Sequence, residues 1–172
     1  MIYALDDIEP DISPDAYVHP DATIIGAVTI GPESTIWPGA VLRGDHGRIE
    51  VGARTSIQDG TIVHCTQRWP TMIGSSCVVG HAAHLEGCRV GDGCLIGSGS
   101  IVLGRAVVEP GAAVGAAALV TEDTVVPTGQ IALGVPARLR PMPDDLTSWI
   151  TNAVREYVAS GKHYRTGLRR IR

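Results

Sequence analysis

Residues that could bind a metal lie close together in the middle of the chain. His64, His81 and His84 are three of the six histidines, and Glu86 follows them. Histidine nitrogens and carboxylate oxygens are common zinc ligands, and a catalytic zinc site uses three protein ligands with a fourth position open to water. A metal centre built from these residues is therefore the first hypothesis. It requires a fold that brings the side chains together.

An aliphatic residue recurs at a period close to six, which is typical of hexapeptide repeats in a parallel β-helix. This period fits neither an α-helix nor simple strand alternation. The fifth residue of each unit is usually small and the second is often glycine, which suits the tight corners of such a fold. The eighteen aliphatic positions are Val18, Ile24, Ile30, Ile36, Leu42, Val51, Ile57, Val63, Ile73, Val79, Leu85, Val90, Ile96, Val102, Val108, Val114, Val120 and Val126.

Three units form one turn of the helix, so eighteen units predict about six three-sided turns. The inward aliphatic residues would fill a narrow prism in which each turn contacts only its neighbours. The absence of phenylalanine agrees with a prism that has little room for large aromatic rings. We expect an all-β solenoid over residues 1–140, followed in residues 141–172 by a C-terminal α-helix packed along it and a basic tail.

Two features outside the repeat complete the expected architecture. Residues 43–50 and 64–72 interrupt the period, and insertions of this kind form loops that often carry function. An acidic start at residues 143–145 precedes one apolar stripe at helical spacing. The stripe consists of Leu146, Trp149, Ile150, Ala153, Val154, Tyr157 and Val158.

Composition excludes several classes of partner. A net charge of −4 and a pI near 5.8 give no reason to expect nucleic acid, and no apolar run is long enough for a membrane span. Residues 1–10 carry three acidic side chains and no signal-peptide pattern, so we expect a cytoplasmic protein. The four cysteines form no disulfide framework and are expected to be reduced.

The repeat predicts where the candidate ligands lie. His64 and Glu86 are each the second residue of a unit, one full turn apart, so they should stack on one outer face. His84 flanks the inward Leu85 on that face, about 6.6 Å from Glu86 along the strand. His81 belongs to the preceding corner, roughly 16 Å of extended chain from Glu86. We therefore expect His81 to share a metal with the other two only across an interface, as three copies around a threefold axis would allow.

Several motifs, in order and with fitting spacing, resemble the γ-class carbonic anhydrase family from about residue 10 to about residue 160. The resemblance implies a left-handed β-helix, a homotrimer with a metal at each subunit interface, and reversible hydration of CO2 to bicarbonate. The motifs are Leu42-Arg43-Gly44-Asp45, Ile57-Gln58-Asp59-Gly60, Val63-His64, Val79-Gly80-His81, Leu85-Glu86-Gly87-Cys88 and Leu133-Gly134-Val135-Pro136-Ala137-Arg138.

In that family three histidines hold the metal, which would be Zn²⁺, or Fe²⁺ or Co²⁺. The first two match His64 and His81, but the third falls on Glu86, and Ser56 stands where the family commonly has Asn. Either Glu86 is the third ligand, or His84 is the third ligand and Glu86 orients it, or the metal is lost and the fold serves assembly. A carboxylate ligand should leave bound water less acidic than imidazole does, which predicts weak hydratase activity.

Other residues match family positions around the metal. Arg43 and Asp45 match a pair at the subunit interface, and Gln58 matches a residue that hydrogen-bonds the metal-bound water or bicarbonate. Asp59 matches a carboxylate near the site or interface, and Tyr157 lies where family members carry an aromatic that can reach a site. For Arg43, Asp45 and Asp59, an interface salt bridge is the favoured interpretation over direct catalysis.

Two other functions remain open at this stage. Many acyltransferases share the hexapeptide repeat, and such an enzyme would use a histidine as general base with CoA or a similar donor. The substrate loop or extra domain that they usually carry is not evident in this sequence. The other alternative is a trimeric scaffold or binding protein without catalytic activity.

Overall fold

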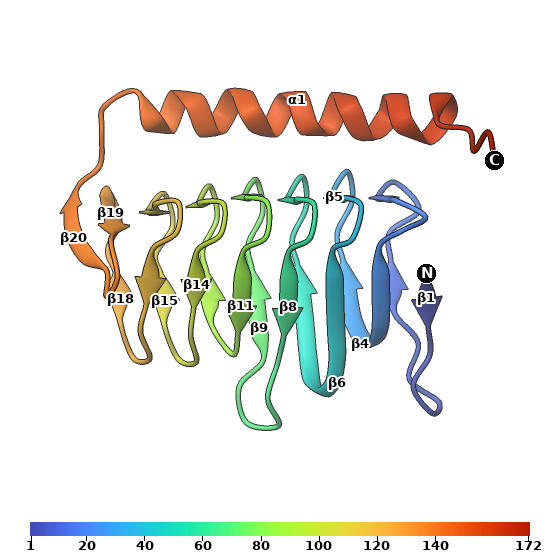
Figure 1. The fold of residues 1–172 in the computed structure, drawn as a ribbon, viewed down its shortest axis with the longest axis horizontal. Helices are drawn as coiled ribbons and strands as arrows, with labels where there is room; N and C mark the ends of the chain where they lie inside the picture. Colours follow the sequence, from blue (N-terminus) through green and yellow to red (C-terminus); the bar gives the residue numbers. More distant parts are fainter.

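Short parallel strands stack into a β-solenoid of about seven turns, and one C-terminal α-helix lies along it (Figure 1). The structure is a computed structural model that describes residues 1–172. The fold class expected from the hexapeptide period is confirmed. The single helix, α1, spans Leu146–Gly167 and lacks the apolar stretch that a transmembrane helix requires.

The solenoid has three walls, two of which are joined by the long strands β4 (Thr23–Ile30) and β6 (Val41–Val51). The first wall contains the N-terminal halves of β4 and β6 with β1 (Ile2–Tyr3), β8 (Ile62–His64), β11 (His84–Glu86), β14 (Ile101–Val102) and β17 (Leu119–Val120). The second wall contains their C-terminal halves with β2 (Asp11–Ile12), β9 (Thr71–Ile73), β12 (Arg89–Val90), β15 (Val107–Val108) and β18 (Val125–Val126).

The third wall is a separate sheet that lies beneath α1 in Figure 1. Its last strand is antiparallel and closes the end of the solenoid. The strands in order are β3 (Tyr17–Val18), β5 (Thr35–Ile36), β7 (Ser56–Ile57), β10 (Val78–Val79), β13 (Leu95–Ile96), β16 (Ala113–Val114), β19 (Gln130–Leu133) and β20 (Arg138–Pro141).

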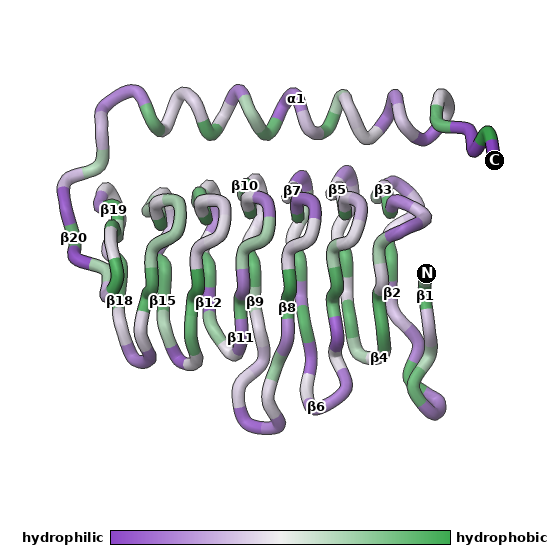
Figure 2. Tube along the Cα trace, viewed as in Figure 1, coloured by the Kyte–Doolittle hydropathy of each residue, from purple (hydrophilic) through white to green (hydrophobic).

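The core is a narrow column to which each unit contributes one aliphatic side chain. On the first wall the register aligns Ile24, Leu42, Val63 and Leu85, and all four are fully buried. Figure 2 shows the hydrophobic colouring along the strands and the hydrophilic colouring at many of the turns. Burial of each such side chain contributes roughly 1.5–3 kcal/mol, so the column supplies the main stabilisation of the solenoid.

The number of turns exceeds the six expected from the sequence because two terminal units escape the aliphatic count. Ile12 lies six residues before Val18 and packs against the core from β2. Ala132 lies six residues after Val126 and is fully buried opposite Val114. The repeat therefore begins one unit earlier and ends one unit later than the sequence pattern indicated.

Glycine at the second position of a unit lets neighbouring turns touch at a corner. A Cβ on Gly52 would lie 2.7 Å from the carbonyl carbon of Gly74, and one on Gly74 would lie 2.7 Å from that of Gly91. Adjacent strands are only about 4.7–4.9 Å apart, which leaves no room for a side chain directed along the stack. These glycines therefore permit the close stacking of the turns.

Helix α1 covers the third wall with a narrow apolar face. Ile150, Ala153 and Val154 are buried against it, in a small cluster that includes Val78 of β10. Trp149, which was expected to share this face, is 52% exposed. The third wall is built of strands of two to four residues, so it covers only a narrow strip of the helix and leaves the edge of the apolar stripe in solvent.

Aromatic rings fix the C-terminal half of α1 to the solenoid. Trp37 lies with its ring centroid 5.9 Å from that of Tyr157 and 5.1 Å from that of Tyr164. Its indole nitrogen donates to the hydroxyls of Thr35 and Ser56, each at 3.0 Å. The buried Trp37 therefore connects the helix to the third wall through both ring packing and hydrogen bonds.

Candidate metal centre

His64 and Glu86 lie side by side on the first wall, in adjacent turns. The register pairs Glu86 of β11 with His64 of β8, and His64 in turn with Arg43 of β6. His64 Nδ1 is 3.5 Å from Glu86 Oε1, and the His64 side chain is only 15% exposed. The repeat thus aligns an imidazole and a carboxylate face to face, as their shared position in the unit predicts.

Glu86 also faces a second imidazole. His84 lies two residues earlier on β11, and its Nε2 is 3.4 Å from Glu86 Oε2. The inward Leu85 between them is fully buried, which fixes both flanking side chains on the outer face. Each oxygen of the Glu86 carboxylate therefore faces one histidine.

The other ring nitrogen of His64 is held by Asp45. His64 Nε2 lies 2.9 Å from Asp45 Oδ1, and the Arg43 guanidinium donates to Asp45 Oδ2. Burial by itself would raise the pKa of Asp45, but the hydrogen bonds from His64 and Arg43 outweigh it and lower that pKa to about 2. Asp45 is therefore an ionised acceptor that fixes the orientation of the His64 ring.

Gly44 lies between Arg43 and Asp45, at the point where β6 passes close to β4. A Cβ on Gly44 would lie 2.5 Å from the carbonyl oxygen of Ala27, on the neighbouring strand β4. The pairing of β4 with β6 shifts register at this point, between Gly26 and Val28. The glycine lets β6 pass close to β4, while the residues on either side of it direct their side chains to Asp45 and His64.

Thr71 connects the loop after His64 to the wall. The buried Thr71 hydroxyl donates to the His64 carbonyl oxygen and accepts the Gly87 N–H at 2.7 Å. It therefore joins the last residue of β8 to the residue that follows β11, immediately beside the two facing side chains. Trp69 in this loop is 43% exposed, with the Arg105 guanidinium 5.7 Å from its ring centroid.

His81 lies in a separate cluster at the corner before β11. Its Nδ1 is 2.9 Å from Asp59 Oδ2, and both side chains are at least half exposed. Burial, and then the nearby Asp59 carboxylate, raises the pKa of the Tyr157 phenol. Asp59, His81 and Tyr157 therefore belong to the corner beneath α1 rather than to the group around Glu86.

A single copy of the chain does not unite the two clusters. No group of three His, Cys, Asp or Glu side chains is arranged to hold a metal ion within one chain. Gln58 is 4% exposed, next to Asp59, and its side chain makes no hydrogen bond to His64 or Glu86. The nine candidate residues therefore divide into Arg43, Asp45, His64, His84 and Glu86 on the wall and Gln58, Asp59, His81 and Tyr157 at the corner.

His46 is a neighbour of this site that was not predicted from the sequence. Its Nε2 is 3.9 Å from Asp45 Oδ2, and its ring centroid is 6.0 Å from that of His64. The side chain is 65% exposed and thus lies between the site and solvent. Its position directly after Asp45 in the charged insertion is the one signal in the sequence that could have drawn attention to it.

Comparison with known proteins shows that the chain is similar to a plant γ-carbonic anhydrase and to CaiE. Residues 10–44 match the family described as bacterial transferase hexapeptide (six repeats). The chain is 40% identical over 159 residues to gamma carbonic anhydrase 2, mitochondrial, of Arabidopsis thaliana; the match covers 88% of this chain and 57% of that protein. It is 37% identical over 162 residues to the carnitine operon protein CaiE of Escherichia coli, covering 90% and 80%. The chain thus spans a little over half of the plant protein's length.

Two solved structures share this fold over nearly the whole chain. A hexapeptide transferase family protein from Anaplasma phagocytophilum is 36% identical, with a TM-score of 0.91 over 95% of this chain and 97% of that one. A structure from Bacillus cereus is 32% identical, with a TM-score of 0.93 over 96% of each chain. The chain therefore belongs to the hexapeptide-repeat family, among the proteins that resemble γ-carbonic anhydrases and CaiE.

Proposed function

We propose that this protein is a metal-dependent hydratase that interconverts CO2 and bicarbonate as a homotrimer. The observation that carries the proposal is the position of the Glu86 carboxylate, between His64 and His84, with Asp45 behind His64. When His64 donates from Nε2 to Asp45, the lone pair on its Nδ1 faces Glu86 Oε1. Two acceptors at 3.5 Å require a cation or a proton between them.

The donor set fits a zinc ion. Zinc bonds of about 2.0–2.2 Å at a tetrahedral angle place two donor atoms about 3.4 Å apart, close to the 3.5 Å between His64 Nδ1 and Glu86 Oε1. A ligating histidine usually donates its other ring N–H to a carboxylate, and Asp45 is in that position. In the proposed site His64 and Glu86 of one copy and His81 of the next hold the metal, which when bound would supply activated water for attack on CO2.

The remaining residues would position the ligands and the substrate. Arg43 holds the Asp45 carboxylate, and Asp45 fixes the ring of His64. His84 would hold the second oxygen of Glu86, so that the first stays directed at His64. Asp59 would orient His81 through Nδ1 and leave Nε2 for the neighbouring copy. Gln58 would hydrogen-bond the reacting water or bicarbonate.

Metal content tests this proposal directly. The purified protein should contain close to one zinc, iron or cobalt ion per chain, measured by elemental analysis after purification without chelators. His64→Ala and His81→Ala should each lose it, whereas His163→Ala, which removes an exposed histidine of α1, should retain it. A protein that binds no metal, or that keeps full stoichiometry in both site variants, contradicts the proposal and favours a scaffold.

CO2 hydration followed by stopped flow then separates the enzyme from a metal-binding scaffold. The metal-loaded protein should accelerate CO2 hydration above the uncatalysed rate in buffer alone. Both site variants should show only that uncatalysed rate. An acyltransferase would instead bind acetyl-CoA, which the same preparation should not do measurably if the hydratase assignment holds.

A further inference from the structure

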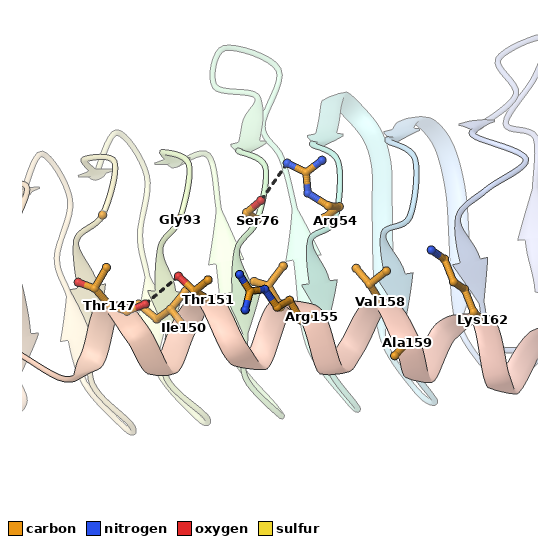
Figure 3. Close-up of a pocket in the computed structure, with 12 residues that line it drawn as sticks. Arg54, Ser76, Gly93, Thr147, Ile150, Thr151, Arg155, Val158, Ala159 and Lys162 are labelled. Carbon is orange, nitrogen blue, oxygen red and sulfur yellow. Dashed lines mark hydrogen bonds between the residues drawn. The ribbon is translucent and has the colours of Figure 1, made fainter.

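A groove of about 640 Å³ runs between α1 and the corner of the solenoid that precedes the third wall, whereas His64 and Glu86 lie on the first wall (Figure 3). The helix contributes Ile150, Val154 and Val158, which make much of one side apolar. The other side is a row of corner residues from successive turns. Pockets of 300–1,000 Å³ with apolar walls and a few polar groups are typical of small-molecule sites.

The row of corner residues carries polar side chains at one end of the groove and glycines at the other. Arg54, Ser76, Gly93 and Gly111 occupy equivalent positions before β7, β10, β13 and β16, all with positive φ between 53° and 70°. The first two carry polar side chains, and Arg54 Nη2 donates to Ser76 Oγ at 3.3 Å. The last two carry none, and a Cβ at either glycine would meet nothing within 4 Å. One half of the corner row therefore carries polar side chains and the other half carries none, while α1 contributes Thr147, Ile150 and Thr151 to the groove.

Positive charge gathers at the polar half. Arg155 of α1 lines the groove and makes no ion pair, and Figure 3 shows it on the helix near Ser76 and Arg54. Lys162 also lines the groove, but Glu33 neutralises it at 2.6 Å. Two guanidinium groups thus remain for a ligand in a protein whose net charge is −4. Guanidinium groups bind carboxylates and phosphates through paired hydrogen bonds.

From this arrangement we infer that the groove binds a single-chain anionic amphiphile, a fatty-acid carboxylate or an alkyl phosphate. The anionic head lies between Arg54 and Arg155. The alkyl chain runs along Ile150 toward Thr147, past the bare corners at Gly93 and Gly111. The stretch of α1 from Arg155 to Thr147 is about 12 Å long at 1.5 Å per residue. The site is independent of the metal centre, so its test does not depend on hydratase activity.

Calorimetric titration of the full-length protein with octanoate, decanoate and dodecanoate, each below its micelle concentration, tests the inference. Burial of each methylene should tighten Kd about three- to fourfold until the chain outgrows the groove. Decyltrimethylammonium has a tail of equal length and a cationic head, so it should bind at least tenfold more weakly than decanoate. Equal binding of the two amphiphiles, or no binding of either, overturns the inference.

Variants locate the site. Arg155→Gln and Arg54→Gln should each weaken decanoate binding about tenfold, whereas Arg89→Gln, an exposed arginine on the second wall, should not change it. Thr151→Trp should fill the glycine end of the groove and remove the dependence on chain length. Thermal melting checks that each variant is folded. Unchanged binding in both arginine variants contradicts the inference.

A sedimentation experiment with vesicles distinguishes binding of a free amphiphile from binding of a membrane lipid. Vesicles of neutral phosphatidylcholine and vesicles containing one-fifth phosphatidate are sedimented with the protein. Free decanoate should bind while neither vesicle sediments the protein, because a lipid held in a bilayer cannot place its chain between α1 and the solenoid. Binding only to the phosphatidate vesicles would assign the arginines to a membrane surface and overturn the small-molecule site.

Discussion

The Glu86 carboxylate faces the His64 imidazole from the adjacent turn of the solenoid, with Oε1 3.5 Å from Nδ1. The two residues occupy the same position in units one turn apart, and Asp45 holds the far side of the imidazole. A carboxylate therefore lies where the resemblance to γ-class carbonic anhydrases implies a third histidine.

Glu86→His should increase CO2 hydration several-fold in kcat/KM. An imidazole gives the metal less negative charge than a carboxylate does, so activated water forms more readily at neutral pH. Stopped-flow hydration assays and metal analysis of the same preparation measure the effect per bound ion. Glu9→His, which makes the same exchange at an exposed residue of the N-terminal segment, is the matched control. Equal hydration rates per metal ion in the parent and Glu86→His proteins would contradict the idea that a carboxylate ligand at position 86 weakens hydratase activity.

Asp45→Asn should weaken metal binding by about 10- to 100-fold, the usual cost of losing a partner that orients a metal ligand. The amide keeps the shape of Asp45 but removes the negative charge on the oxygens that accept hydrogen bonds from His64 and Arg43. Competition with a chromogenic chelator gives the dissociation constant. Asp123→Asn breaks an exposed pair with Arg105 on another turn and should leave the constant unchanged. Equal constants for the two variants would show that Asp45 does not support the site.

Gly44→Ala should destabilise the fold by about 1–3 kcal/mol and reduce metal content. Its Cβ would lie 2.5 Å from the Ala27 carbonyl oxygen, so β6 must move away from β4 and carry Arg43 and Asp45 with it. Gly104→Ala is the matched control, since its nearest neighbour would be 3.9 Å away. Urea unfolding compares the two variants. Similar midpoints for both would mean that the close approach at Gly44 is not required.

Trp37→Ala should lower the free energy of unfolding by about 3–5 kcal/mol, as expected for loss of a buried aromatic ring. The change removes the contacts to Tyr157 and Tyr164 and both hydrogen bonds of the indole. Trp149→Ala removes an exposed ring from α1 and should cost less than about 0.5 kcal/mol. If both variants unfold at the same urea concentration, Trp37 does not fix α1 to the solenoid.

The hexapeptide period predicted the walls, the register and the facing of His64 with Glu86, because each depends only on position within a repeated unit. The period missed Ala132 and Ile12, because an alanine and a lone terminal aliphatic residue do not stand out from the sequence around them. Trp149 fits the helical spacing but is exposed, since the width of the covering wall cannot be read from the helix.

The site was less predictable than the fold. The pairings of Asp45 with His64 and of Asp59 with His81 depend on side-chain geometry at corners and insertions, where the period is broken. His46 approaches Asp45 and His64 through such an insertion. Whether His81 meets Glu86 depends on a second copy of the chain, and a single sequence does not record how copies are arranged.

Mixing subunits of two inactive variants tests the shared site most directly. His64→Ala and His81→Ala each lack one ligand, so homotrimers of either variant should bind no metal. In trimers refolded from an equal mixture, a site is intact when a His81→Ala copy supplies His64 and Glu86 and the next copy supplies His81. Random assembly makes about a quarter of the sites intact, so the mixture should recover about a quarter of the parental metal content. Recovery of none, with trimers verified by light scattering, would contradict a metal centre built from two copies of the chain.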